Sequence, residues 1–249
     1  MKIFAHRGYS SKYPENTMAA FKAVAKLPVD GVELDVHLTK DNQVVVIHDE
    51  KINRTSNGKG YVKDMTLKDL RKFDFGSWFS SKFRGEKIPT LQEVLQLFKD
   101  THHRINIELK SDSFIYSGLE ELVLKEIEEF GARDRILISS FDHEAVKRMV
   151  EIAPDIESAP LFSHGILNMV RYRSLIPSKS LHVSFRAATR RPVLEAIKAK
   201  VPVRVYTINK KEQAEVLFNL GAEAIITDYP EEMLDFIKSK KFKKSELEG

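Results

Sequence analysis

The chain has 249 residues, with 40 Lys and Arg against 36 Asp and Glu, 42% hydrophobic residues and no cysteine. A chain of this length buries enough surface to fold as one large domain or two small ones without covalent cross-links. The lack of cysteine excludes disulfides, thiolate zinc sites, iron–sulfur clusters and cysteine nucleophiles. Any metal must therefore be held by oxygen or imidazole ligands.

Neither an export signal nor a membrane span is predicted. Only Ile3–Ala5 forms an apolar run before the first charged residues, and no other run approaches membrane-spanning length. We therefore expect a cytoplasmic protein with no stable membrane insertion. Segment 238–249 holds five lysines and two glutamates, which account for +3 of the net charge of +4. This pattern predicts a basic, flexible tail on a body that is close to neutral, and we expect no nucleic-acid partner.

Short β-branched runs alternate with segments of helical period along the chain. The runs predicted as strands are Ile3–Ala5, Gly31–Val36, Ile105–Leu109, Ile136–Ser139, Ile156–Leu161, Leu181–Val183, Val203–Tyr206 and Ala224–Ile226. The predicted helices are Met18–Ala25, Leu91–Lys99, Leu119–Phe130, Glu144–Ile152, Pro192–Lys200, Lys211–Leu220 and Glu231–Lys238. The alternation predicts an α/β fold with a parallel sheet. Its number of units favours a single (β/α)8 barrel over residues 1–237, with a doubly wound sheet as the alternative.

One region after the second strand interrupts this alternation. The chain turns at Lys40–Asn42, is apolar at Val44–Ile47 and is irregular from about 49 to 89, which we interpret as a small insertion. Five aromatic residues crowd together within it, at Phe73, Phe75, Trp78, Phe79 and Phe83. We expect most of them to form a core of the insertion. One or two are candidates to cover a ligand pocket, because loops after barrel strands surround the site of such folds.

Acidic residues occur in two of the predicted strands. Residues two apart in a strand share a face, so Glu33 and Asp35 point together, as do Glu108 and Lys110. One such pair is as compatible with a salt bridge as with a site. If the three acids meet at one barrel mouth, each like-charged pair at about 4 Å costs roughly 4 kcal/mol at an effective dielectric of about 20. A divalent cation would remove this repulsion, and carboxylate ligands select Mg²⁺ or Ca²⁺.

Two histidines end apolar runs near these acids. His6 follows the first strand and precedes Arg7, and His48 ends the apolar run of the insertion. Imidazoles that titrate near neutrality suit general acid–base catalysis of P–O cleavage. Arg7 offers a planar fork for a phosphate, or a salt bridge to Glu33 or Asp35. The histidines interpreted as structural are His37, His102, His103, His143, His164 and His182.

Five short motifs occur in order along the chain. They are His6-Arg7-Gly8, Pro14-Glu15-Asn16-Thr17, Glu33-Leu34-Asp35-Val36, His48-Asp49 and Asn106-Ile107-Glu108-Leu109-Lys110. In order and spacing they resemble the glycerophosphodiester phosphodiesterases, and Val205–Asn209 and Ile226–Pro230 are similar to the last two strands of that family. The resemblance extends from Ile3 to about Ile237. Five motifs in order are a specific signal, whereas His-Arg-Gly alone would be weak.

The resemblance implies a TIM barrel with an insertion after the second strand. It implies hydrolysis of a small-molecule glycerophosphodiester, such as glycerophosphocholine or glycerophosphoethanolamine, to sn-glycerol 3-phosphate and an alcohol. It further implies one divalent cation, Ca²⁺ or Mg²⁺, on Glu33, Asp35 and Glu108, and an acid–base pair formed by His6 and His48. The positions implied on the substrate side are Arg7, Lys110, Glu15 and Tyr206.

Two of the substrate-side positions have further interpretations. Many members of the family carry Trp where this chain has Tyr206, a change that alters the alcohol pocket and leaves the chemistry untouched. Asn16 or Thr17 is expected to cap the first predicted helix. Glu15 either belongs to the same turn or reaches the site.

Several mechanistic and functional alternatives remain open at this stage. The nucleophile is either a hydroxyl of the substrate glycerol, which gives a cyclic phosphate that water opens, or a water molecule that attacks directly. Related barrels act on lysophospholipids or phosphoinositides. A non-catalytic phosphate-binding barrel is the alternative of a different class, and its signature would be the loss of His6, His48 or one acid. All of these residues are present.

Overall fold

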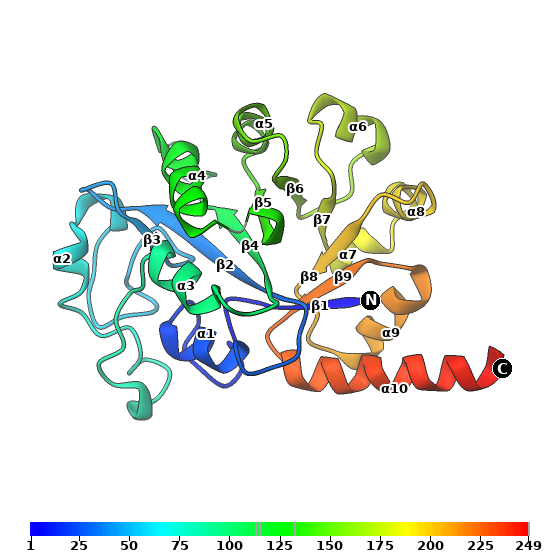
Figure 1. Cartoon of the computed structure of the whole chain (residues 1–249), viewed down its shortest axis with the longest axis horizontal. Helices are drawn as coiled ribbons and strands as arrows, with labels where there is room; N and C mark the ends of the chain where they lie inside the picture. Colours follow the sequence, from blue (N-terminus) through cyan, green and yellow to red (C-terminus); the bar gives the residue numbers. More distant parts are fainter. Residues whose placement is uncertain (113, 115, 132, 249) are drawn as a thin grey trace.

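The β-branched runs of the sequence form the strands of a closed barrel. The computed structural model describes residues 1–112, 114, 116–131 and 133–248, with side chains as far as Lys240. Within these residues the eight parallel strands are β1 (Lys2–Ala5), β2 (Gly31–Leu38), β4 (Arg104–Leu109), β5 (Ile136–Ser140), β6 (Glu157–Phe162), β7 (Leu181–Ser184), β8 (Val203–Tyr206) and β9 (Ala224–Thr227). Each strand pairs with the next in this order, and β9 pairs with β1. The predicted TIM barrel is confirmed (Figure 1).

Helices connect the strands and pack against the outside of the barrel. They are α1 (Met18–Val24), α3 (Leu91–Phe98), α4 (Leu119–Phe130), α5 (His143–Ile152), α6 (Met169–Leu175), α7 (Phe185–Ala188), α8 (Arg191–Lys198), α9 (Lys211–Leu220) and α10 (Pro230–Glu248). Thr17 caps α1, and Thr90 forms a capping box with Glu93 on α3. In the described part of the chain, no helix has both the length and the apolar character that crossing a bilayer requires.

The helices α6 and α7 were not predicted from the sequence. Helix α6 begins after Asn168, whose φ of 55° and side-chain hydrogen bond to Arg171 N form the cap. Helix α7 is a single turn capped by Ser184. Both are too short to show a helical period over the window of about 11 residues that such an assignment needs. Helix α10 continues to Glu248, and thus its backbone includes most of segment 238–249, for which the sequence predicts a flexible tail.

The insertion folds back against β2. Its strand β3 (Val44–Val46) pairs antiparallel with β2, and α2 (Leu67–Leu70) follows later in the insertion. A separate small core holds it together, formed by Val45, Ile47, Ile52, Val62, Leu70, Phe75 and Ile88.

The five aromatic residues of segment 73–83 differ in burial. Phe75 lies in the small core, and Phe73 packs against it. Trp78 and Phe79 are 39% and 36% exposed, so the expectation that most of the aromatic residues are core is wrong for these two. Phe83 packs on Tyr13 of the first βα loop, with ring centres 5.4 Å apart. Burial here depends on the fold of an irregular loop, which no periodicity in the sequence predicts.

A buried ion network closes the amino-terminal end of the barrel. Arg204, on β8, is 1% exposed and lies 2.7 Å from carboxylate oxygens of both Glu157 and Glu223. Its guanidinium donates to the Ser180 hydroxyl and lies 3.1 Å from His182 Nε2. Burial and the charge of Arg204 hold the pKa of His182 well below its ordinary value, so this imidazole is neutral and accepts the hydrogen bond.

Replacing Arg204 by Met should lower the free energy of unfolding by about 1–3 kcal/mol, because Ser180 would lose a buried donor and Glu157 and Glu223 would keep only Arg104 and Lys2 as cations. Urea unfolding followed by circular dichroism measures the change. Arg191→Met is the matched control, since the Arg191 side chain is 89% exposed beside Glu195. An exposed pair of this kind contributes about 0–1 kcal/mol. Equal unfolding free energies for the two variants would show that the buried network does not stabilise the barrel.

Candidate active site

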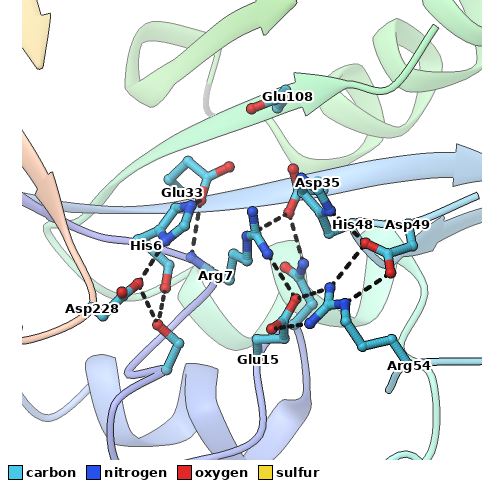
Figure 2. Close-up of polar contacts among 12 residues, drawn as sticks. His6, Arg7, Glu15, Glu33, Asp35, His48, Asp49, Arg54, Glu108 and Asp228 are labelled. Atoms are coloured by element: carbon cyan, nitrogen blue, oxygen red, sulfur yellow. Dashed lines mark hydrogen bonds and ion pairs between the residues drawn. The ribbon is translucent and has the colours of Figure 1, made fainter. Parts of the chain in front are cut away.

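Three buried carboxylates form the centre of the barrel mouth. Glu33 and Asp35 lie on β2, and Glu108 lies opposite Asp35 in the parallel pairing of β2 with β4. Alternate residues of a strand share a face, so all three side chains turn toward the same space (Figure 2). One oxygen of each lies within 4.8 Å of the others. The structure thus brings together the three acids that the sequence analysis singled out.

The charges of these carboxylates oppose one another. Burial raises the pKa of Glu33 well above its ordinary value, and the charges of Asp35 and Glu108 add to this effect. Burial and Asp35 likewise raise the pKa of Glu108. Among the described residues, Glu33 Oε1 has no hydrogen-bond partner although it is buried. A hard divalent cation fits this group, because it binds carboxylate oxygens and supplies the missing positive charge.

Asp35 is the carboxylate that its neighbours keep ionised. Burial acts to raise its pKa, but the charges of Arg7, His48 and Lys110 outweigh burial and hold the pKa well below the usual range. Asn16 Nδ2 donates a hydrogen bond to Asp35 Oδ2 at 2.8 Å. Arg7 Nε lies 3.4 Å from the same oxygen. This carboxylate is therefore charged and oriented before any ligand binds.

The backbone of the first βα loop adopts left-handed conformations that point an N–H group at the acidic centre. Arg7 and Asn16 both lie in the left-handed region, with φ of 53° and 55°. In this conformation the Arg7 N–H donates to Glu33 Oε2 at 2.9 Å, and the Asn16 N–H donates to the Arg7 carbonyl at 2.9 Å. A non-glycine residue in a sparsely populated region costs about 1–3 kcal/mol. The loop accepts this strain and gains a donor aimed at a buried carboxylate.

His6 lies between the acidic centre and an aspartate. Its Nδ1 lies 2.6 Å from Asp228 Oδ1, and its Nε2 lies 3.9 Å from Glu33 Oε2. Asp228 follows β9 and also accepts hydrogen bonds from Ser10 Oγ and Asn209 Nδ2. Burial alone would raise the pKa of Asp228, but the hydrogen bond and charge of His6 lower it to about 2. An ionised Asp228 keeps a proton on His6 Nδ1 and leaves Nε2 facing the site.

His48 has a similar pair of neighbours. Its Nδ1 lies 2.7 Å from Asp49 Oδ1, and its Nε2 lies 3.4 Å from Lys110 Nζ. The hydrogen bond with His48 holds the pKa of Asp49 below its usual range. The buried His37 donates through Nε2 to the His48 carbonyl at 3.0 Å. His37, interpreted from the sequence as structural, thus supports the backbone on which His48 is mounted.

Arg54, from the insertion, links the two sides of the mouth. It donates to both oxygens of Asp49, at 2.8 and 2.9 Å, and to both oxygens of Glu15, at 2.7 and 2.8 Å. Glu15 also accepts a hydrogen bond from Arg7 at 2.8 Å. An unbroken chain of charged contacts therefore runs from His48 to Arg7 through the insertion (Figure 2).

Lys110 and two aromatic rings form a wall beside Glu108. Lys110 Nζ donates to Glu108 Oε1 at 2.8 Å and lies 5.9 Å from the centre of the Phe141 ring. Burial acts to lower the pKa of Lys110, but Glu108 and Asp35 outweigh it and raise the pKa. Phe141 contacts Tyr206 edge to face, with ring centres 6.0 Å apart. The Tyr206 hydroxyl is buried beside the Ser163 side chain.

Two grooves open at this end of the barrel. The groove on the β1 side has a volume of about 290 Å³ and is lined by His6, Arg7, Ser10, Ser11, Glu15, Asp228 and Tyr229. The groove beside β4 and β5 has a volume of about 420 Å³ and is lined by Ser111, Asp112, Phe141, Asp142, Glu144 and Arg148. A small diester held at the carboxylates would have a groove for each of its two ends.

The residues singled out from the sequence all lie at this mouth. They are His6, Arg7, Glu15, Glu33, Asp35, His48, Glu108, Lys110 and Tyr206. No role in the site was predicted from the sequence for Asn16, Asp49, Arg54 or Asp228. Asp228 directly follows a strand, which is the same signal that identified the other strand-end residues. The position of Arg54 carried no such signal, because it lies within the irregular insertion.

Comparison with known sequences gives a consistent result. The model of the "Glycerophosphoryl diester phosphodiesterase family" matches residues 6–232. A "Glycerophosphodiester phosphodiesterase" from Caldanaerobacter subterraneus subsp. tengcongensis is 40% identical over 236 residues, which cover 95% of this chain and 97% of the relative. A protein of the same description from Bacillus altitudinis is 42% identical over 233 residues, which cover 92% and 95% of the two chains.

Solved structures with the same fold include enzymes of this kind. A phosphodiesterase from Oleispira antarctica, in complex with the product sn-glycerol-3-phosphate, has a TM-score of 0.85 and 28% identity, with 96% of this chain and 97% of that chain covered. A glycerophosphodiester phosphodiesterase from Agrobacterium tumefaciens has a TM-score of 0.78 and 27% identity, with 92% and 97% covered. Both similarities extend over nearly the whole chain.

Proposed function

Because the chain belongs to the glycerophosphoryl diester phosphodiesterase family and is a hydrolase, we propose that it cleaves glycerophosphodiesters to sn-glycerol 3-phosphate and an alcohol by metal-assisted, two-histidine catalysis. The observation that carries the proposal is the placement of two histidine–aspartate pairs beside three clustered carboxylates. P–O cleavage needs a proton acceptor, a proton donor and positive charge at the phosphate. The mouth supplies residues for each of these.

Glu33, Asp35 and Glu108 would hold one divalent cation, Ca²⁺ or Mg²⁺. Their short separation, the raised pKa of two of them and the unpartnered oxygen of Glu33 support this assignment. When bound, such a cation polarises a phosphoryl oxygen and offsets the charge that develops in the transition state. Arg7 and Asn16 orient the carboxylates, and such outer contacts strengthen metal binding.

His6 and His48 would form the acid–base pair. Asp228 and Asp49 each occupy Nδ1 of one imidazole, so Nε2 is the nitrogen that exchanges protons with the substrate. One histidine accepts the proton of the attacking hydroxyl group. The other gives a proton to the alcohol oxygen as its bond to phosphorus breaks.

The attacking group is either a glycerol hydroxyl of the substrate or a water molecule. Attack by the glycerol hydroxyl forms a cyclic phosphate and releases the alcohol, after which water opens the ring with the proton transfers reversed. Attack by water gives sn-glycerol 3-phosphate in one step. In both routes Arg7 and Lys110 would stabilise charge on the non-bridging oxygens.

The alcohol part of the substrate would lie in the groove beside β4 and β5. Ser111 Oγ lines this groove and is buried without a partner among the described residues. Asp112, Asp142 and Glu144 outnumber the one cation of the lining, Arg148, and Phe141 offers an aromatic ring. A cationic head group complements this lining through ion pairing and cation–π contact. Choline and ethanolamine diesters are therefore the substrates that we propose first.

The first test is release of sn-glycerol 3-phosphate from glycerophosphocholine and glycerophosphoethanolamine, with added Mg²⁺ or Ca²⁺ and with chelator. Release that requires metal is expected. Asp112→Asn should lower kcat/KM for glycerophosphocholine by about two- to fivefold, the effect of one exposed ion pair, and leave glycerophosphoglycerol unaffected. An equal loss of kcat/KM on both diesters would show that this groove does not bind the cationic head group. No release from any of the three would direct the search to lysophospholipids and phosphoinositides.

Glu108→Gln should abolish both metal binding and turnover, because it removes one of three charged oxygen ligands. Calorimetric titration with Ca²⁺ and Mg²⁺ measures binding, and the coupled assay measures turnover. Glu212→Gln on α9 changes an exposed carboxylate away from the barrel strands and should match the parent protein in both measurements. Undiminished activity of Glu108→Gln in chelator would refute the metal site.

His6→Ala and His48→Ala should each lower kcat by about 10²–10⁴-fold, the usual contribution of one acid–base group, and retain metal binding. Single-turnover kinetics and metal titration on the same preparations separate the two effects. His102→Ala replaces an exposed histidine that precedes β4, at the amino-terminal end of the barrel, and is the control. Loss of metal binding in either site variant would mean that the histidine acts as a ligand. A cyclic glycerol phosphate trapped in a slowed variant would favour attack by the glycerol hydroxyl.

A further inference from the structure

Segment 161–200 is one of the strongly basic parts of the chain. The basic residues of segment 161–200 are Arg171, Arg173, Lys179, Arg186, Arg190, Arg191, Lys198 and Lys200, and its single acidic residue is Glu195. The whole chain has a net charge of only +4, so the rest of the chain is net negative. The body that is near neutral in sum is therefore unevenly charged along its sequence.

The same segment exposes large apolar side chains. Leu167 is 91% exposed, Leu175 is 67% exposed and Val170 is 41% exposed. Arg171 and Arg190 are exposed nearby, and within the described ranges neither forms an ion pair. We call this surface the α6–α8 face, formed by Leu167, Val170, Arg171 and Leu175 on α6 and the loop before it, together with Arg190. It offers leucine side chains and unpaired arginine charge together.

The α6–α8 face adjoins the catalytic mouth. Strand β6 ends at Phe162, and the loop that follows begins at Ser163, beside the Tyr206 hydroxyl. A Cβ built on Gly165 of this loop would lie 3.7 Å from Arg190 Cβ, so the loop runs past the start of α8. Helices α6 and α8 pack against each other (Figure 1). Because loops that follow barrel strands emerge at the carboxyl-terminal end, Leu167 lies on the same end as the acidic centre.

We propose that the α6–α8 face docks the protein peripherally on an anionic lipid bilayer, with Leu167 at the level of the head groups and the arginines against lipid phosphates. Exposed apolar side chains beside basic residues are the combination that binds bilayer surfaces. Nucleic acid would also attract the arginines, but it has no apolar phase to receive Leu167 and Leu175. Docking would turn the catalytic mouth toward the surface where phosphodiester head groups are abundant.

Vesicle co-sedimentation of the full chain tests this docking. Vesicles of equal parts phosphatidylcholine and phosphatidylglycerol should bind the protein at low salt, and vesicles of phosphatidylcholine alone should bind it much less. Arg171→Gln combined with Arg190→Gln should weaken binding by about 25-fold, since each arginine near an anionic surface contributes about fivefold. Leu167→Ser should weaken binding by at least about tenfold through loss of apolar burial.

Matched substitutions elsewhere control for general changes of charge and hydropathy. Arg84→Gln removes an exposed arginine of the insertion, and Ile152→Ser removes a side chain on α5 that is 41% exposed. Both controls should bind vesicles as the parent does, and all variants should keep the parent kcat/KM on a soluble diester. Absence of binding to anionic vesicles, insensitivity to the face variants, or tighter binding to a short DNA duplex than to vesicles would overturn the docking surface. Vesicle binding is measured without turnover, so its outcome is independent of the substrate assay.

Discussion

Mutual repulsion of three buried carboxylates is the constraint around which the mouth of this barrel is organised. Glu33 and Glu108 have raised pKa values because both are buried and because the neighbouring Asp35 is kept ionised. Three groups offset part of this charge. They are the backbone N–H of Arg7 in the strained first loop, the side-chain amide of Asn16 and the ammonium of Lys110. We propose that a divalent cation binds the negative charge that these groups leave uncompensated.

Buried charges of opposite sign are paired at one end of the barrel, whereas buried charges of like sign lie together at the other end. At the amino-terminal end, Arg204 meets two glutamates, and the neutral His182 accepts one of its hydrogen bonds. At the carboxyl-terminal end, Glu33, Asp35 and Glu108 lie together with like charge, and Glu33 Oε1 has no hydrogen-bond partner in the described structure. Paired charges contribute to one folded state, whereas unpaired groups in a cleft are available to a ligand. Stability and chemistry thus reside at different ends of the same strands.

Most of the fold was predictable because it depends on local periodicity. The strands, the longer helices and the shared face of Glu33 and Asp35 follow from spacings of two and about 3.6 residues. The partners of the histidines were not predictable in this way, since Asp228 lies 222 positions from His6 along the chain. Arg54 and the exposed Trp78 belong to an irregular insertion, whose contacts depend on tertiary packing alone.

Arg54 bridges the insertion and the first βα loop. The insertion therefore cannot be replaced by that of a relative without regard to this loop. The two bidentate contacts of Arg54 join a residue that follows β3 to a residue of the first βα loop, so each segment limits which partners the other can accept. A chimera that imports the insertion of a relative would need a basic residue that reaches Glu15 from the same place. Without it, Asp49 and Glu15 would lose their common counter-ion. The insertion and the first βα loop would then no longer be fixed relative to each other at the mouth.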